Sequence, residues 1–305
     1  MHGHSHDHSH GHNHSDHFNT HNRAFAIAVF LNLVFVAIEA VYGVLAGSLA
    51  LLADAGHNLS DVLGLVMAWV ASWLASRKAT DRNTYGLKKS TILAALFNAL
   101  ILIAAVGGIA WEAIRRFSEP AEVAGMTVII VAAIGVLING VTMLLFMSGQ
   151  KGDLNIRGAF LHMAADTAVS VGVVVAGLVI MLTGISWIDP LVSLVIAAVI
   201  FLGTWQLLKD SVSLAVDAVP RDIDPAEVFE MLKTLPGVES VHHLHIWALS
   251  TTENALTVHL VKPDTEGDDR VIEQATEMLA HDFNIKHVTI QWERAASNCP
   301  NMAYC

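Results

Sequence analysis

Charged residues are scarce in this sequence: aspartate, glutamate, lysine and arginine make up 15% of its 305 residues, while 54% are hydrophobic. A soluble globular domain carries about 25% charged residues. This shortage argues against a soluble enzyme and against a disordered chain. Basic residues are the scarcer kind, with 17 lysines and arginines against 28 acids. The resulting net charge of -11 disfavours nucleic-acid binding, which needs a basic surface.

Cysteine is almost absent too. Cys299 and Cys305 are the two in the chain, which excludes a disulfide framework. In a cytosolic compartment both would be thiols. They either add ligands to a metal site near Glu293 or belong to a free C-terminal tail, and both interpretations stay open.

Acidic charge is concentrated toward the C-terminus. Residues 209–305 hold 16 of the 28 acids but only seven of the 17 lysines and arginines, so their net charge is -9. The sequence therefore divides into an apolar part and an acidic, soluble part.

Residues 1–22 hold nine of the 17 histidines, separated by glycine, serine, aspartate and asparagine. The segment lacks an apolar core after a basic start, so it is not a signal peptide. It has too few apolar residues to fold, and its composition is typical of a disordered, metal-binding tail. An expression tag is the alternative, although a tag is usually an unbroken histidine run.

Six long apolar stretches follow, dominated by leucine, valine, isoleucine, alanine and glycine. Each approaches or exceeds the ~20 residues that a helix needs to cross a hydrocarbon core about 30 Å thick. Buried strands of a soluble sheet would be only about 4–8 residues long. The sequence therefore predicts six transmembrane helices, at about residues 24–46, 49–75, 90–114, 123–147, 158–183 and 187–208.

Lysine and arginine in the short loops predict the orientation, because they concentrate on the cytoplasmic side of a membrane protein. With the N-terminus inside, eight such residues lie on the cytoplasmic side and two, Arg115 and Arg116, on the other. An even number of helices returns the C-terminus to the cytoplasm. The His-rich segment and the acidic part are therefore expected to share one compartment.

From Pro220 onwards the pattern changes to short elements. Two helices and three strands are expected, at 225–235 and 268–283 and at 238–249, 254–262 and 287–293. The order α-β-β-α-β indicates a small cytoplasmic α+β domain, ferredoxin-like in type, which alone says little about function. On the first strand, His243 and His245 are expected to point to one face, as structural or surface residues, and His242 to the other.

Histidines and carboxylates recur at helical spacing within two of the apolar stretches. Asp54, His57 and Asp61 lie within an arc of about 60° on one face of the second helix. His162 and Asp166 share a face of the fifth helix at spacing i, i+4. A charged carboxylate at mid-membrane costs roughly 2.5–3.5 kcal/mol, so such groups persist by pairing or by binding a ligand. The two His–Asp pairs would close a tetrahedral shell if their helices face each other.

Imidazole and carboxylate ligands together suit Zn²⁺, whose usual coordination is tetrahedral. The apolar part contains no thiolate for Cu⁺ and no all-oxygen cage for Mg²⁺ or Ca²⁺, while Co²⁺, Ni²⁺, Fe²⁺ and Cd²⁺ remain compatible. The alternative is that each His–Asp pair is a structural hydrogen bond within its helix. Asp54 has three open roles: a partner behind a ligand, a carboxylate on the path of the ion, or a hydrogen-bond acceptor near the helix start. Asn32 and Glu39 share a face of the first helix, where they line a hydrated path or hydrogen-bond between helices.

Three segments carry a family resemblance: GSLALLADAGHNLSD (47–61) and GAFLHMAADTAVS (158–170), each with an HxxxD motif, and GVESVHHLHIWALS (237–250). With these motifs the chain resembles the cation diffusion facilitator family, in its bacterial zinc-exporter branch, over nearly its whole length. The resemblance implies a homodimeric, multi-pass cation–proton antiporter of the plasma membrane that works by alternating access.

The resemblance also implies which residues hold the transported Zn²⁺, namely His57, Asp61, His162 and Asp166. Some members carry further ligands in the loop between the second and third helices. Here that loop, residues 76–89, contains no histidine, so no metal site is expected in it.

In the cytoplasmic domain, the resemblance matches His242 and His259 to metal ligands of the family. His287 and Glu293 are candidates for the third and fourth ligands. The domain is therefore expected to bind Zn²⁺ as a regulatory ligand and to form the dimer.

The chain is thus expected to divide into a His-rich tail (1–22), a transport domain (23–208), a metal-sensing and dimerisation domain (209–294) and a cysteine-containing tail (295–305). Two other classes of protein compete with a transporter. A membrane-embedded metalloenzyme would need a general base and an open coordination position, and the sequence contains no HExxH motif. A metal sensor or buffer would not explain paired carboxylates within the membrane. The sequence therefore favours export of zinc, or of another divalent metal, in exchange for protons, without enzymatic activity.

Overall fold

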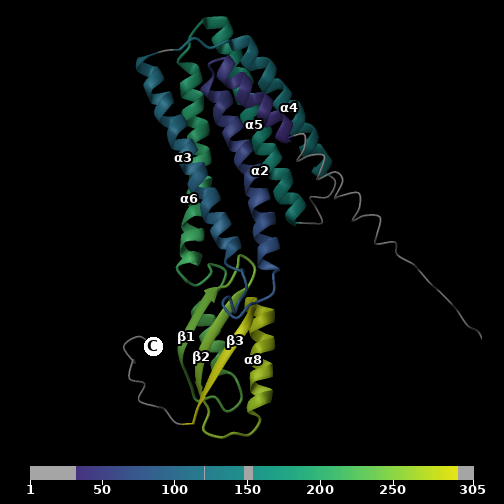
Figure 1. The fold of residues 1–305 in the computed structure, drawn as a ribbon, viewed down its shortest axis with the longest axis vertical. Helices are drawn as coiled ribbons and strands as arrows, with labels where there is room; N and C mark the ends of the chain where they lie inside the picture. The colour runs from purple at the N-terminus through teal and green to yellow at the C-terminus, as the bar shows by residue number, and fades with distance from the viewer. Residues whose placement is uncertain (1–31, 120, 148–153, 295–305) are drawn as a thin grey trace, which may run out of the picture. The chain divides into compact units, whose positions relative to one another are not determined.

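A computed structural model gives the fold (Figure 1) and describes residues 32–119, 121–147 and 154–294. The predictions for the His-rich segment 1–22 and for Cys299 and Cys305 lie outside these residues. Within them, five helices are long and apolar enough to cross a membrane, and a shorter apolar helix spans Asn32–Leu45. The five are α2 (Leu49–Ala75), α3 (Ser90–Ser118), α4 (Gly125–Met147), α5 (Leu154–Thr183) and α6 (Ile188–Ala215).

These helices confirm the predicted membrane part, although residues 24–31 of the first predicted helix lie outside the described residues and several bounds differ from the prediction. Helix α6 continues to Ala215, beyond the predicted end at residue 208. Its last turns carry Lys209, Asp210 and Ser211, which are too polar for the apolar stretch but compatible with a helix. Hydropathy marks where the lipid core ends, and a helix does not have to end at the same residue.

Large apolar side chains on these helices point outward. Trp69, Trp111, Leu182 and Leu202 are each 70–73% exposed. In water such surface would be strongly unfavourable, at roughly 25 cal/mol per Å² of apolar area. Exposed apolar patches of this extent mark a surface that contacts lipid, so the chain is a multi-pass membrane protein.

Helix α2 begins at a cap that involves the start of α6. Ser48 Oγ donates to Asp189 Oδ1 at 2.5 Å, and the backbone N–H groups of Leu49 and Ala50 donate to the same carboxylate at 2.8 and 3.3 Å. Arg116 adds an ion pair at 3.9 Å. The first N–H groups of a helix lack partners within the helix, so the buried Asp189 both satisfies them and joins the two helix ends.

The cytoplasmic part contains α7 (Pro225–Lys233), β1 (Ser240–Ala248), β2 (Asn254–Val261), α8 (Asp268–Phe283) and β3 (Ile285–Glu293). The sheet order is β1-β2-β3, with β1 and β2 antiparallel and β2 and β3 parallel. Helix α8 makes the crossover that a parallel pair requires and lies against the sheet (Figure 1). This arrangement confirms the predicted α-β-β-α-β domain.

The core of this domain lies between its helices and its sheet. It forms because each element presents one apolar face, and helix α7 is further held by its N-cap, where Asp224 Oδ1 accepts from the Ala226 N–H at 2.8 Å. The side chains that are no more than 1% exposed include Val228, Leu232, Leu256, Leu260, Leu279 and Ile285.

The contacts divide the chain into two compact units. Among the described residues, one unit comprises those up to Val62 together with those between Val106 and Ala198, and the other comprises Leu63–Ala105 together with those from Val199 onwards. In the first unit α4 and α5 pack closely, and Figure 1 shows them side by side. Gly125 allows this approach, because a Cβ atom there would lie 3.0 Å from the Gly177 carbonyl oxygen.

Candidate metal centres

Helices α2 and α5 meet through three pairs of polar side chains in antiparallel order. Asp61 contacts His162, His57 contacts Asp166, and Asp54 contacts Ser170. Residue numbers fall along α2 as they rise along α5, as expected for two antiparallel helices. Each contact therefore joins side chains at the same height along the two helix axes. The i, i+3 and i, i+4 spacings on each helix place these side chains on one face.

Four of these side chains form one cluster within the first unit. His162 Nε2 lies 3.1 Å from Asp61 Oδ2 and 3.7 Å from Asp166 Oδ2. His57 Nε2 lies 3.4 Å from Asp166 Oδ1 and 3.8 Å from Asp61 Oδ2. The two imidazole rings are 5.9 Å apart, edge to face. The structure therefore brings all four residues predicted for the transport site into contact, and ligand atoms of three of them, Asp61, His162 and Asp166, lie within 4.8 Å of one another.

The shorter distances run between the helices, and the longer ones run within each helix. Both intrahelical His–Asp distances exceed a normal hydrogen bond, which is about 2.7–3.2 Å. The pairs are therefore not hydrogen bonds within single helices. A tetrahedral ion with bonds of about 2.0–2.1 Å separates its ligand atoms by roughly 3.3 Å, and the four measured distances bracket that value.

Two side chains of this cluster each have a polar atom without a hydrogen-bond partner among the described residues. Within the described residues, Oδ2 of the buried Asp166 accepts no hydrogen bond and the buried Nδ1 of His57 has no hydrogen-bond partner. An unpaired polar atom in a buried position costs about 1–3 kcal/mol. A divalent cation between the carboxylates would give Asp166 Oδ2 a partner, so the donor set suits Zn²⁺ as cargo.

Asp54 lies outside this cluster. It is fully buried one turn before His57 on α2, and its Oδ2 accepts a hydrogen bond from Ser170 Oγ at 3.2 Å. Its other neighbour is Glu39, from the helix Asn32–Leu45. Sequence analysis named Asp54 and Glu39 but had no signal that joins them, because helical spacing says nothing about contacts between helices.

The cytoplasmic domain holds a second cluster, made by His242, His259 and Glu293. Glu293 Oε1 lies 3.0 Å from His259 Nδ1 and 3.3 Å from His242 Nε2. The sheet register explains the cluster, because His242 faces His259 across β1 and β2, and Glu293 lies opposite Val261 on β3. One ligand atom from each of the three lies within 4.8 Å of the others, which is compatible with a shared metal ion.

A β-bulge between His242 and His245 changes the expected alternation of strand β1. His243 adopts a positive φ of 50° there, and its ring lies 4.7 Å from the ring of His259. Partial burial and the nearby His259 lower the pKa of His243, which favours its neutral form. Bulges re-aim side chains in this way, so His243 borders the cluster, whereas His245 is exposed.

His287, the remaining predicted ligand, lies elsewhere. It is six residues before Glu293 on β3, about 20 Å away along a strand that rises ~3.3 Å per residue. Its Nε2 lies 3.0 Å from Lys88 Nζ and 3.4 Å from Glu253 Oε2. The structure therefore joins three of the four predicted cytoplasmic residues and places His287 beside an ion pair.

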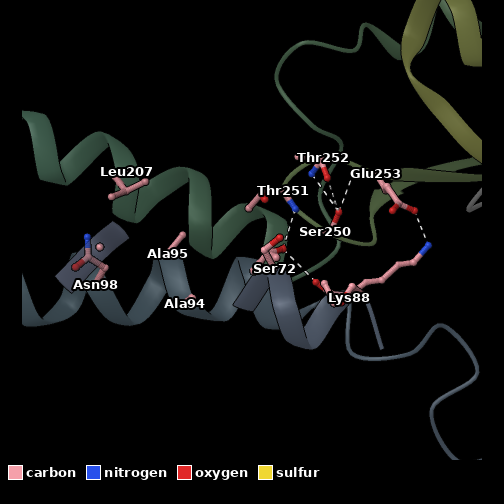
Figure 2. A pocket seen from close by; sticks show the side chains of 14 residues that line it. Ser72, Lys88, Ala94, Ala95, Asn98, Leu207, Ser250, Thr251, Thr252 and Glu253 are labelled. Carbon is pink, nitrogen blue, oxygen red and sulfur yellow. Dashed lines mark hydrogen bonds and ion pairs between the residues drawn. The ribbon is translucent and has the colours of Figure 1, made fainter. Parts of the chain in front are cut away.

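That ion pair borders a cavity of about 630 Å³ in the second unit (Figure 2). Lys88 Nζ lies 2.5 Å from Glu253 Oε2, and the Thr251 N–H donates to Thr91 Oγ1 at 3.0 Å. The hydrogen bond from Lys88 holds the pKa of Glu253 below its ordinary value. These bonds join the turn after β1 to the start of α3, and partners 165 positions apart left no signal in the sequence.

The apolar helices and the cluster of histidines and carboxylates define a multi-pass membrane protein with a polar site in its helical part. A family described as the cation efflux transmembrane domain matches residues 25–214. A second, described as the cytoplasmic domain of cation efflux proteins, matches residues 220–295. The chain therefore belongs to the cation efflux, or cation diffusion facilitator, family.

Curated relatives cover most of the chain. The metal cation efflux system protein CzcD of Cupriavidus metallidurans is 39% identical over 92% of this chain and 89% of its own length. The cadmium, cobalt and zinc/H(+)-K(+) antiporter of Bacillus velezensis is 38% identical over 89% and 88%. The zinc transporter ZitB of Escherichia coli is 36% identical over 88% and 86%. These relatives are named as efflux proteins, transporters or antiporters.

Proposed function

We propose that this protein exports a divalent metal cation, zinc in the first place, in exchange for protons and by alternating access. The observation that carries the proposal is the cross-helix cluster of His57, Asp61, His162 and Asp166. Each of its two imidazoles lies 3.1–3.8 Å from both carboxylates, and such His–Asp separations suit the ligands of a tetrahedral ion. The names of the relatives support the same activity.

Proton exchange follows from the chemistry of these ligands. Metal binding requires neutral imidazoles and ionised carboxylates, so it releases the protons that the same groups held. Histidine ordinarily titrates near pH 6.5, close to cytoplasmic pH. A site open to the cytoplasm then favours the metal, and a site open to a more acidic exterior favours protons. The inward proton gradient would drive metal outward.

The ligand set favours zinc without excluding related ions. Cadmium and cobalt appear in the name of one relative, and both accept imidazole and carboxylate ligands. We propose transport and not catalysis, because four protein ligands fill a tetrahedron and leave no position for a reactive water.

The remaining assignments are part of the same proposal. We place the protein in the plasma membrane as a homodimer, with both termini in the cytoplasm and residues 23–208 as the transport domain. Residues 209–294 would sense cytosolic zinc through His242, His259 and Glu293. The tails 1–22 and 295–305 would flank these domains.

The test is Zn²⁺ flux into proteoliposomes, with and without an imposed pH gradient. Wild type is compared with Asp166→Ala, and Asp81→Ala, an exposed loop carboxylate, is the control. Gradient-driven flux that Asp166→Ala abolishes and Asp81→Ala retains supports the proposal. Flux that ignores the gradient contradicts proton coupling, and the absence of zinc, cadmium and cobalt flux contradicts transport.

A further inference from the structure

Two carboxyl side chains are fully buried next to each other in the first unit. Glu39 of the helix Asn32–Leu45 and Asp54 of α2 are both 0% exposed. Within the described part of the chain, no lysine, arginine or histidine nitrogen lies within ion-pair distance of either. Two ionised carboxylates in such a position would repel each other with no cation to compensate them.

The hydrogen bonds around the two carboxyls show how they coexist. Asn58 Nδ2 donates to Glu39 Oε2 at 3.4 Å, and Ser170 Oγ donates to Asp54 Oδ2 at 3.2 Å. The other oxygens, Glu39 Oε1 and Asp54 Oδ1, have no hydrogen-bond partner within the described residues. Asn58 lies one turn after Asp54 on α2, so its bond to Glu39 brings the two carboxyls to the same face of that helix. Ionised carboxylates only accept hydrogen bonds, so two such carboxyls can satisfy each other only when one of them carries a proton.

The pair lies one helical turn from the candidate transport site on both helices that form it. Asp54 is three residues before His57 on α2, and its partner Ser170 is four residues after Asp166 on α5. At 1.5 Å per residue, these steps correspond to about 5–6 Å along the helix axes. On the side of the candidate transport site, the titratable neighbours of Asp54 are His57 and Asp166. Glu39, from the helix Asn32–Leu45, is its remaining titratable neighbour.

We propose that Glu39 and Asp54 form a proton-binding site, distinct from the metal ligands, that holds one shared proton and releases it when a divalent cation occupies the neighbouring cluster. This inference rests on the proposed function for its link to the metal, whereas the shared proton rests on the burial of the two carboxyls and on their unpaired oxygens.

The proton balance of the step is simple. Before metal binding, one carboxylic acid and one carboxylate share a proton and carry one negative charge together. As the dication arrives one turn away, its charge stabilises a second carboxylate, and the proton leaves the carboxyl oxygen for water. The pair then carries two negative charges, and Asn58 and Ser170 each keep donating to one of them. The return of the proton favours release of the metal.

The first experiment is infrared difference spectroscopy on the full-length, metal-free protein at pH 7. Wild type is expected to show the C=O stretch of one buried protonated carboxyl that Glu39→Gln and Asp54→Asn each remove. Glu112→Gln is the matched control, since Glu112 pairs with Arg115 and Arg116 in α3. Should Glu39→Gln fail to fold, Ser170→Ala keeps both carboxyls and is expected to shift the band. A wild-type spectrum without this band, or one that the variants leave unchanged, overturns the shared proton.

The second experiment adds Zn²⁺ to the same proteins in weakly buffered solution with a pH indicator. Zinc is expected to abolish the carboxyl band in wild type, and Glu39→Gln is expected to release one proton fewer per bound zinc than wild type or Glu112→Gln. An unchanged proton count overturns the coupling. A wild type that binds no zinc contradicts the proposed function instead, while the band in the metal-free protein still decides whether the pair shares a proton.

Discussion

The imidazole of His162 contacts the carboxylate of Asp61 on the opposite helix more closely than that of Asp166 on its own helix. The distances are 3.1 Å between helices and 3.7 Å within α5. His57 repeats the relationship, with 3.4 Å to Asp166 and 3.8 Å to Asp61. Each helix therefore supplies half of the site, and a relative movement of α2 and α5 would open both contacts between the helices together.

This symmetry predicts that both histidines are needed for zinc binding. His57→Ala and His162→Ala are each expected to weaken zinc affinity by more than the roughly 10- to 100-fold typical of losing a group behind a ligand. Isothermal titration calorimetry measures this affinity in a chain that lacks residues 1–22 and carries His259→Ala, so that the other proposed zinc sites do not contribute. Asp81→Ala controls for general damage, and affinity that survives either histidine substitution would contradict the four-ligand site.

The cytoplasmic cluster predicts a different outcome for two histidines of the same domain. In a chain without residues 1–22 and with Asp166→Ala, His259→Ala is expected to remove the remaining zinc binding, because His259 contacts Glu293. His287→Ala is the control and is expected to retain binding, since His287 contacts Lys88 instead. If His259→Ala and His287→Ala lost zinc binding equally, His287 would have to be counted among the zinc ligands.

The shared cap at the start of α2 predicts a stability effect without a binding effect. Asp189→Ala removes the acceptor of three donors and is expected to cost about 1–2 kcal/mol, the upper range for a helix cap. Asp189→Asn keeps one acceptor oxygen and should cost less. Unfolding midpoints in a denaturing detergent measure the difference. Asp210→Ala, at an exposed ion pair with Arg221, is the control, and an equal effect there would refute the cap.

Two glycines of α4 predict opposite responses to the same substitution. Replacing a glycine inside a helix by alanine normally stabilises the helix by about 1 kcal/mol. At Gly135 a Cβ atom would lie 2.7 Å from Phe35 Cζ and 3.1 Å from Ser170 Oγ, so Gly135→Ala is expected to destabilise the protein. At Gly140 a Cβ atom would have no neighbour within 4 Å among the described residues, so Gly140→Ala is expected to be neutral or stabilising. The test is to compare the thermal unfolding midpoints of the Gly135→Ala and Gly140→Ala variants. Equal midpoints would contradict the close packing at Gly135.

The ion pair between Lys88 and Glu253 predicts an acid-sensitive contribution to stability. The hydrogen bond from Lys88 lowers the folded-state pKa of Glu253 below the value of the unfolded chain, which is about 4.3. Its contribution is therefore complete above that value and is lost as the pH falls through the lower folded-state pKa. Stability is measured from pH 7 to pH 3 in wild type and Glu253→Gln, with the exposed Glu239→Gln as control. If the free energy of unfolding depended on pH in the same way in wild type and Glu253→Gln, the predicted contribution of Glu253 would be excluded.

Some features of the fold follow from local pattern alone. The apolar stretches predicted the membrane helices because length and hydropathy are properties of each segment by itself. The residue patterns of the shorter segments predicted the elements of the cytoplasmic domain for the same reason. The i, i+4 spacing placed His57 beside Asp61, and His162 beside Asp166, on single faces.

The sequence by itself thus determined which residues share a helix face and which segments are long enough to span a membrane. Only the tertiary structure decided which faces meet. The antiparallel packing of α2 and α5 places Asp61 beside His162. The packing of the helix Asn32–Leu45 places Glu39 beside Asp54. The register of β3 brings Glu293 to the cytoplasmic cluster and leaves His287 outside it. Helix contacts and strand register depend on the packing of the whole chain, whereas periodicity is a property of a few neighbouring residues.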